Sequence, residues 1–461
     1  MTKQASRRAF LQRASALGMA GVAAPWAINL LSIAEAAAAT ASDYKALVCI
    51  FLYGGNDNGN TVVPYDANGY AAYQLLRPTL AYGRDTLAAT ALAASAPMLD
   101  SSGAAREFAL APALAPLLPV FNAGQLGVML NVGPLVRPTA KAQYQARTVP
   151  LPPKLFSHND QQSIWQSSRP EGAISGWGGR LGDLFESGNG NATFTCVNVS
   201  GNAVFMVGKS AVQYQVSASG SMQFSGLKAP LFGSSAASEA LRTLVTQQRT
   251  HQLENEYNRV TRRSVDANTA LTAAFAAAPP LQTAFPASNS LGDQLKMVAR
   301  MISASGSLGA KRQVFFVSMG GFDTHDNLAA THPVLLGRLG EAMAAFLKAT
   351  QELGVADKVT TFTASDFGRT LVANNDGSDH GWGSTHFMMG GAVKGQRFYG
   401  TAPVFANNGP DDVGQGRLLP STSVDQYAAT LGKWLGASDS DLLALLPNLA
   451  NYTTRNLGFL G

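Results

Sequence analysis

The stretch QVFFVSMGGFDTHD, residues 313–326, decides the fold. Its first seven residues form a run that is apolar at most positions and has the length of one strand. Such a run predicts a strand buried on both faces, as in parallel sheets. The run ends in two glycines, which are followed by Asp323 and His325. Open α/β sheets bind ligands just past the carboxyl ends of their strands, so we expect a functional site here.

Two further segments repeat this design. The run ALVCIFL at residues 46–52 leads into GGND with Asp57, and VTTFTA at residues 359–364 leads into Ser365 and Asp366. Helical patterns at 291–304 and after residue 326 alternate with these strands, which indicates right-handed βαβ crossovers. The sequence therefore predicts an α/β fold for a single domain that spans residues 44–461.

Residues 190–285 differ from this pattern and predict an insertion. Residues 192–199 and 203–207 alternate as strands do, and they are expected to form a small antiparallel unit or an extension of the sheet edge. Residues 236–266 have apolar side chains at a helical period, which predicts one long, polar helix.

Composition excludes some classes of function. Charged residues make up 14% of the 461 residues, and the formal net charge is only +5. The chain contains no basic tract with interleaved aromatic residues, so we do not expect it to bind nucleic acid. Cys49 and Cys196 lie in apolar strand-like runs, where buried free thiols are expected in preference to a disulfide.

The N-terminus has the pattern of an export signal. The segment SRRAFLQ, residues 6–12, resembles the twin-arginine consensus, and an Ala- and Gly-rich apolar run follows at 14–33. Four alanines at 36–39 suit a signal peptidase, so we expect a signal peptide over residues 1–39. The alternative is a membrane anchor, but Gly18, Gly21 and Pro25 interrupt the run. A periplasmic or secreted protein is predicted, with the twin-arginine translocase as its export partner and no membrane span in the mature form.

The clustered aspartates and histidines suggest a metal. Several carboxylates on one rim of a sheet repel one another unless a cation neutralises them. Four of the six histidines in the chain lie within residues 313–386. Mixed nitrogen and oxygen ligands suit Zn²⁺, Mn²⁺ or Fe, whereas carboxylates alone suit Mg²⁺ or Ca²⁺. The expected metal ligands are Asp57, Asp323, His325, Asp366, His380 and His386, which would hold one or two divalent ions.

Each of these residues also has a structural interpretation. An aspartate after a glycine at a strand end is often a turn former or a helix cap. His380 can act behind the ligands, with Asp379 orienting it. His386 lies beside apolar residues and can be a core histidine, and His332 at a helix start is interpreted as structural.

Five segments together resemble a known family. They are GGND at 54–57, FSHNDQ at 156–161, GGFDTH at 320–325, SDFGRT at 365–370 and DHGWG at 379–383. These blocks are similar to those of the family called domain of unknown function 1501, whose members are often exported by the twin-arginine route. That family is similar to the alkaline phosphatase and sulfatase superfamily. The resemblance implies an alkaline-phosphatase-like αβα sandwich with a mixed, mostly parallel sheet, often with a two-metal site.

The resemblance also implies roles for single residues. Asp57 matches the ligand after the first strand, Asp323 with His325 the pair after a middle strand, and Asp366 a later bridging aspartate. The late histidine would be His380 or His386. The nucleophile would be a hydroxyl at a helix N-terminus, where backbone N–H groups favour an anion. Ser157 fits that context and Thr61 is second, although Ser157 can equally be a plain N-cap.

These assignments lead to a function. The hypothesis is an exported metal-dependent hydrolase of phosphate or sulfate esters, acting on a small-molecule or polymer substrate. Ser157 would attack, His158 would belong to the same catalytic group, and Arg369 would either clamp the substrate oxyanion or form a structural salt bridge. Two other functions stay open on the same fold, a non-catalytic envelope protein that binds a polymer or a partner, and a metal-binding lyase or mutase.

The chain departs from the superfamily at three points. Phe367 stands where a histidine usually follows the bridging aspartate, and the gap from Asp323 to His325 is shorter than usual. The Cys-x-Pro-x-Arg signature that sulfatases need to make formylglycine is absent from the sequence. A formylglycine-dependent sulfatase is therefore not expected.

Overall fold

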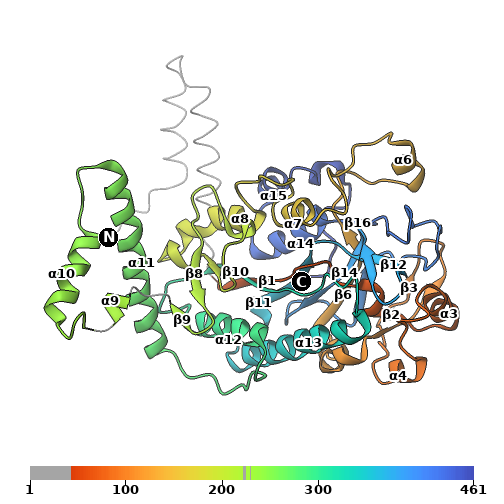
Figure 1. The fold of residues 1–461 in the computed structure, drawn as a ribbon, viewed down its shortest axis with the longest axis horizontal. Coiled ribbons are helices and arrows are strands. Elements are labelled where there is room, and N and C mark those ends of the chain that lie inside the picture. The colour runs from red at the N-terminus through yellow and green to blue at the C-terminus, as the bar shows by residue number, and fades with distance from the viewer. Residues whose placement is uncertain (1–42, 222–224, 229) are drawn as a thin grey trace, which may run out of the picture.

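The structure of the chain, a computed structural model, describes residues 43–221, 225–228 and 230–461 (Figure 1). The signal peptide expected over residues 1–39 lies outside the described residues. No helix in the described ranges is long and apolar enough to cross a membrane.

Ten strands of the described chain form one central sheet. They are β1 (Lys45–Leu52), β6 (Leu126–Gly133), β7 (Cys196–Asn198), β8 (Tyr214–Ser217), β9 (Gly220–Ser221), β10 (Arg312–Met319), β11 (Val359–Ser365), β14 (Ser384–Met389), β15 (Arg397–Gly400) and β16 (Thr422–Ser423). Their order is β15-β6-β14-β11-β1-β10-β7-β8-β9, with β16 also paired to β6. The five strands from β11 to β8 run parallel, and β14 is antiparallel to both of its neighbours.

Strand β1 lies at the centre of the sheet and is buried on both faces. Ala46, Val48 and Ile50 pack into one hydrophobic cluster, whereas Leu47 and Cys49 pack into another. This alternation follows from the two-residue period of a strand. Every position from 46 to 52 is apolar because both faces of β1 are covered.

Helices cover the two faces. One layer contains α7 (His158–Ser167), α8 (Trp177–Phe185), α14 (Val424–Leu435) and α15 (Asp439–Leu445), and the other contains α12 (Ser290–Ser303) and α13 (Leu328–Glu352) (Figure 1). The predicted alkaline-phosphatase-like αβα sandwich is therefore confirmed in its layers and in its mixed, mostly parallel sheet.

Smaller elements lie around this sandwich. The other helices are α3 (Ala67–Leu76), α4 (Arg84–Ala88), α5 (Leu118–Asn122), α6 (Lys141–Ala146), α9 (Ser225–Lys228), α10 (Ser235–Thr246) and α11 (Gln252–Ala277). Three two-stranded sheets pair β2 (Val62–Pro64) with β5 (Phe108–Leu110), β3 (Met98–Leu99) with β4 (Ala105–Arg106), and β12 (Arg369–Ala373) with β13 (Ser378–His380).

The region 190–285 has two parts. Strands β7 and β8 extend the edge of the central sheet, which is one of the two arrangements expected for this segment. The single helix expected over 236–266 is wrong, because the chain breaks between α10 and α11. The Asn258 side-chain amide donates to the carbonyl oxygens of Leu244 and Gln247, which satisfies acceptors that the end of α10 leaves open.

The two cysteines agree with the sequence-based expectation. Cys49 and Cys196 are free and buried. Burial raises the pKa of both thiols, so they stay protonated and pack as small apolar side chains.

Candidate metal centre

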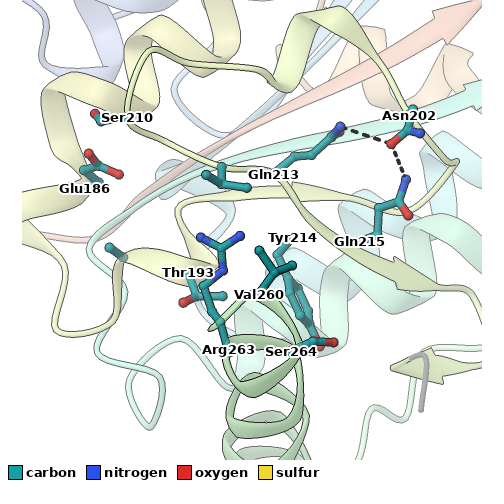
Figure 2. A pocket seen from close by; sticks show the side chains of 12 residues that line it. Glu186, Thr193, Asn202, Ser210, Gln213, Tyr214, Gln215, Val260, Arg263 and Ser264 are labelled. Atoms are coloured by element: carbon teal, nitrogen blue, oxygen red, sulfur yellow. Dashed lines mark hydrogen bonds between the residues drawn. The ribbon is translucent and has the colours of Figure 1, made fainter. Parts of the chain in front are cut away.

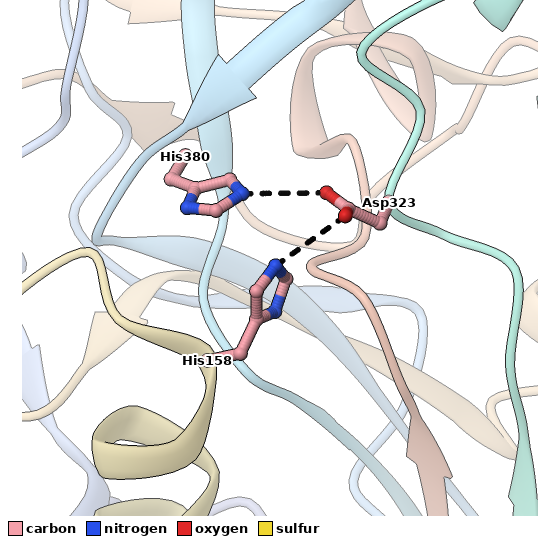
Figure 3. Close-up of side chains that lie close together, drawn as sticks. All are labelled: His158, Asp323 and His380. Atoms are coloured by element: carbon pink, nitrogen blue, oxygen red, sulfur yellow. Dashed lines mark ion pairs between the residues drawn. The ribbon is translucent and has the colours of Figure 1, made fainter.

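Four ionisable side chains meet at the carboxyl end of the parallel strands. They are Asp323, which follows β10, His325, His158 at the start of α7, and His380 at the end of β13. The three that Figure 3 labels, His158, Asp323 and His380, each offer a ligand atom within 4.8 Å of the others'. Within the described ranges this is the group that could hold a metal ion.

The Asp323 carboxylate lies at the centre of the cluster. Its Oδ1 is 3.2 Å from Nε2 of His325 and 3.3 Å from Nε2 of His380, and its Oδ2 is 3.5 Å from Nε2 of His158 (Figure 3). The Nε2 atoms of His325 and His380 are 2.9 Å apart. All three imidazole rings thus present the same nitrogen to one point.

The other nitrogen of each ring has an acceptor. Nδ1 of His158 lies 2.6 Å from Asp366, and Nδ1 of His325 lies 3.0 Å from Asp379. Nδ1 of His380 lies 2.8 Å from the backbone oxygen of Phe156. Because a carbonyl or carboxylate oxygen can only accept, each Nδ1 carries the proton, and a neutral ring then directs an Nε2 lone pair toward the cluster.

Local backbone geometry brings these parts together. Phe156 has a φ of 72°, which is uncommon for a residue with a side chain and aims its carbonyl at His380. Gly54, at the turn after β1, has a φ of 116°, and a Cβ there would lie 2.3 Å from the backbone nitrogen of Asp323. Only glycine allows this close approach of two strand ends.

The spacing of the ligand atoms fits a metal ion. Zinc bound at about 2.0–2.1 Å in tetrahedral geometry keeps its ligand atoms about 3.3 Å from one another. Four separations within the cluster, the three that involve Asp323 and the one between His325 and His380, range from 2.9 to 3.5 Å. His325 lies outside the set of three residues whose ligand atoms are all within 4.8 Å of one another. The donor set of three imidazoles and one carboxylate is also one that Zn²⁺, Mn²⁺ or Fe accepts.

The cluster is open to solvent on one side. The Asp323 side chain is 46% exposed and that of His325 is 40% exposed. Phe367 is buried beneath the cluster, and its ring centroid lies 4.9 Å from that of His158 and 4.7 Å from that of His380. Phe367 therefore forms part of the floor of the cluster.

The pKa shifts follow the contacts. The hydrogen bond that His158 donates to Asp366 raises the pKa of His158, whereas burial lowers the pKa of His380. Burial acts to raise the pKa of Asp323, but the hydrogen bond and charge of Arg369 outweigh it, so the net pKa is lowered. Asp323 is therefore ionised at neutral pH, as a metal ligand must be.

Arg369 is fully buried, and protein atoms take up most of its donors. Its Nη1 donates to Asp323 at 2.8 Å and to the Gly54 oxygen at 3.0 Å, and its Nε donates to the Ser378 oxygen at 2.9 Å. Of the two roles expected for Arg369, the structure has the salt bridge. Its guanidinium holds the Asp323 carboxylate in place, and we do not assign it to substrate binding.

Asp57 offers no free oxygen to the cluster, whereas Asp366 keeps one: its buried Oδ1 makes no hydrogen bond within the described residues. Asp57 is buried, forms an ion pair with Arg77 at 2.9 Å and accepts from the Ser378 hydroxyl at 2.7 Å. Asp366 Oδ2 accepts from Gln162 at 2.7 Å in addition to its contact with His158. The first aspartate stabilises the fold, and the second orients a histidine of the cluster.

His386 and His332 lie in the core. Nδ1 of His386 contacts the Thr363 hydroxyl at 3.1 Å, and burial lowers the pKa of this histidine to about 3. Burial also lowers the pKa of His332 to about 4, and its Nε2 contacts the Asn56 side chain. Both are neutral core histidines, which was one of the interpretations open for His386 and the one favoured for His332.

The two candidate nucleophiles differ in access. The Thr61 hydroxyl is buried and donates to the Asp57 carbonyl at 2.6 Å, so it is already used. Ser157 is half-buried beside His158 and donates to the Asp160 carboxylate at 2.9 Å. Ser157 is the N-cap residue of α7, but its side chain makes no capping hydrogen bond.

Sequence reasoning missed two features of the cluster. His158 was assigned to the catalytic group and not to the metal ligands, although the FSHNDQ block places it at a helix start. Asp379 was expected to orient His380, but it contacts His325. Asp379 and His380 are consecutive residues of β13, and successive side chains of a strand point to opposite faces. Asp379 is therefore directed to the ring of His325.

Known proteins were compared with the chain by fold and by sequence. Solved structures include Ps i-CgsB in complex with k-i-k-neocarrahexaose, with 9% identity and a TM-score of 0.35 over 88% of this chain and 74% of that one. The PsFucS1 sulfatase from Pseudoalteromonas sp. has 9% identity and a TM-score of 0.34 over 89% and 71%. A variant of the alkaline phosphatase PafA has 10% identity and a TM-score of 0.26 over 72% and 64%. No curated protein sequence matches the chain.

These similarities are too distant to assign an activity, and the function is inferred below from the side chains of this chain. The sequence comparison with protein families is decisive for membership. The model for the protein of unknown function family DUF1501 matches residues 44–444, so this chain belongs to the DUF1501 family.

Proposed function

We propose that this protein is an exported metal-dependent hydrolase of phosphate or sulfate esters, with one divalent cation bound by His158, Asp323, His325 and His380. The observation that carries the proposal is the convergence of three Nε2 atoms on the Asp323 carboxylate, with an acceptor on every Nδ1.

Electrostatics supports a cation at this point. With protons on both Nδ1 atoms, the lone pairs of His325 and His380 face each other at 2.9 Å. Such a pair is unfavourable unless a proton or a metal ion lies between the two nitrogens. Histidine ligands of metals commonly donate their other N–H to a carboxylate or a backbone carbonyl, as all three rings do here.

The ligand set supports one ion and not two. The oxygens of Asp57 are used by Arg77 and Ser378, and Asp366 faces Nδ1 of His158. Within the described residues, the atoms that converge are sufficient for a single metal. Three imidazoles favour Zn²⁺, Mn²⁺ or Fe over Mg²⁺ and Ca²⁺, which prefer oxygen ligands.

Exposure supports catalysis over a purely structural site. Structural zinc sites are closed, whereas catalytic sites keep a position open. The Asp323 and His325 side chains are 46% and 40% exposed, so a substrate can approach from solvent. A divalent cation here would supply Lewis acidity and a nucleophile from water at neutral pH.

The protein groups have separate tasks in this proposal. Arg369 and Asp366 hold the Asp323 carboxylate and the His158 ring in position. Ser157 is the alternative nucleophile to water, and Asp160, 2.9 Å away, would accept the hydroxyl proton. The serine oxygen would form the new ester bond as the bond to the substrate's ester oxygen breaks, and the alcohol would leave with a proton from water. Retention of a phosphoryl group on Ser157 separates this route from direct attack by water.

The test is metal analysis combined with hydrolysis assays on the mature chain purified from the exporting host. We expect about one equivalent of Zn, Mn or Fe and turnover of an aryl phosphate or an aryl sulfate. His325→Ala and His380→Ala should lose the metal and lower turnover roughly 100-fold or more. His251→Ala is the matched control, because His251 is exposed at the start of α11, outside the cluster.

Two results would reject the proposal. A metal-free wild type that still hydrolyses esters would remove the cation from the reaction. A full complement of metal without turnover of any phosphate or sulfate ester would favour the second function, a non-catalytic envelope protein that binds a polymer or a partner. The salt bridge between Arg369 and Asp323 favours this second function, because it keeps the guanidinium from binding a substrate oxyanion.

Export is part of the same proposal. It is supported by the paired arginines and the apolar run of residues 6–33, followed by small residues before Ala39. Periplasmic or secreted location is tested by fractionation of the host, and replacement of Arg7 and Arg8 by lysine should leave the precursor inside the cell.

A further inference from the structure

Helix α11 has one apolar face, and only half of that face is covered. Ala267, Leu271 and Ala274, in its C-terminal half, are buried against the body of the protein. Leu253 and Tyr257 lie on the same face in the N-terminal half, and they are 76% and 63% exposed. Residues three, four and seven apart share a helix face, so the covered and uncovered positions belong to one stripe.

The uncovered half belongs to a projecting part of the molecule. Helices α10 and α11, residues 235–277, form an arm that extends beyond the edge of the central sheet (Figure 1). Asn258 fastens α11 to the end of α10 on another side of the helix, so α10 does not cover the stripe. Val260, 46% exposed, continues the stripe toward the body.

A cavity lies where the arm leaves the body. It has a volume of about 580 Å³ and is lined by Val260 and Arg263 of α11 and by Tyr214 of β8 (Figure 2). Val212, which is 50% exposed, lines it from the sheet side. The stripe therefore borders a recess at its body end, where Val260 lines the cavity.

Charges along one flank of the stripe have a definite order. Glu256 and Arg259 form an ion pair at 2.8 Å. Glu256, Arg259 and Arg263 are three and four residues apart in α11, so they lie on one flank of the helix. An acidic residue thus comes first and basic residues follow toward the C-terminus of the helix.

We infer that two copies of this chain associate through their arms, with the α11 helices antiparallel. In an antiparallel pair of helices, residues on the same flank face each other in reverse order. Glu256 of one copy then meets Arg263 of the other, and the reverse contact forms by symmetry. In this register Val260 lies next to the two-fold axis, and Leu253 and Tyr257 of each copy pack along the α11 helix of the other.

Both signs of charge on one flank favour this occupant over others. A nucleic acid or an anionic membrane would be met by basic residues alone. A self-complementary surface is what a two-fold interface requires. The inference does not depend on the metal centre, since no residue it uses belongs to that centre.

The experiment measures the mass of the mature full-length chain by sedimentation equilibrium. We expect a dimer whose dissociation constant rises at least about tenfold in Tyr257→Asp, because a charge would enter the apolar stripe. Ile174→Asp is the matched control, since Ile174 is 87% exposed outside the arm and its replacement should leave the dimer intact.

Charge exchange provides a second test that does not depend on apolar burial. Glu256→Arg and Arg263→Glu should each weaken the dimer, and the double variant should restore it. The inference is overturned by a wild type that stays monomeric at its highest soluble concentration, including one that instead binds phospholipid vesicles through Tyr257. Loss of association in the double variant equal to the sum of the single losses also overturns it.

Discussion

Two segments of this chain have nearly the same sequence and different tasks. GGND at residues 54–57 follows β1, and GGFD at residues 320–323 follows the neighbouring strand β10. Asp57 is fully buried against Arg77, whereas Asp323 is 46% exposed and lies among three histidines. In both segments a glycine pair at the strand end places a carboxylate at the rim of the sheet. The surrounding residues decide whether that carboxylate stabilises the fold, as Asp57 does, or lies in the candidate metal centre, as Asp323 does.

The arginines explain much of the difference. Arg77 is buried and is shared among Asp57, Asn60 and the backbone oxygen of Thr370. Arg369 is also buried, but it contacts only one oxygen of Asp323. The histidines approach that carboxylate from the open side. The oxygens of Asp57 are therefore taken up by hydrogen bonds within the fold, whereas Asp323 keeps lone pairs that can bind a ligand.

The largest expected effect is the loss of stability when Asp57 is replaced. Asp57→Asn should lower the free energy of unfolding by about 3–5 kcal/mol, because it leaves the buried guanidinium of Arg77 without an anion. Denaturant unfolding of the metal-free protein measures this loss. Metal content of the surviving folded protein should not change, and a loss of metal in this variant would show that Asp57 is a ligand after all.

The next-largest effect should be a loss of folding stability in acid, caused by His332, which contacts Asn56 of the GGND segment. The folded pKa of His332 is about 4, below its ordinary 6.5, so between these values the unfolded chain binds a proton that the folded chain does not. Stability from this residue is therefore complete above about pH 6.5 and is lost as pH falls toward 4. Unfolding at pH 7, 5 and 4 should show a shallower loss for His332→Gln, and parallel curves for the two proteins would contradict the assignment.

The residues behind the open site should have an intermediate effect. Asp379→Asn removes the charged acceptor from Nδ1 of His325 and should weaken metal affinity about 10–100-fold. Competition with a chelator measures this affinity. Asp376→Asn, a nearby carboxylate whose oxygen accepts from the backbone of Asn327, serves as the control and should retain wild-type affinity.

The smallest effect on stability should come from replacement of Asp323. Asp323→Asn should lower the free energy of unfolding of the metal-free protein by about 1 kcal/mol, less than Asp57→Asn does. Water screens the half-exposed carboxylate, and the backbone oxygens of Gly54 and Ser378 still accept from the buried Arg369. The same variant should lose the metal. A destabilisation as large as that of Asp57→Asn would remove the distinction between the two segments.

Much of the fold could be predicted from local patterns. The run at 46–52 is apolar at every position, the runs at 313–319 and 359–364 contain no charged residue, and the structure buries each of them between two helical layers. The arm was harder to predict. Its helical period continues from residue 236 to 266, and only a tertiary contact, the Asn258 amide on the end of α10, shows where the helix breaks.

The candidate site could be predicted only in part. Asp323, His325 and His380 come together as expected, because each follows a strand end in a recognisable block. Asp57 and His386 look alike to them in sequence but have partners from distant segments. Arg77, the C-cap residue of α3, forms the ion pair with Asp57, and Thr363 of β11 contacts His386 of β14.

The sequence by itself determined the parallel strands, the rim on which polar groups gather and the membership of the DUF1501 family. Period and residue type are local properties, and they are sufficient for these conclusions. Only the tertiary structure decided which aspartate is closed by an arginine and which histidines share a point. Burial and charge pairing depend on segments far apart in the chain, so no local pattern records them.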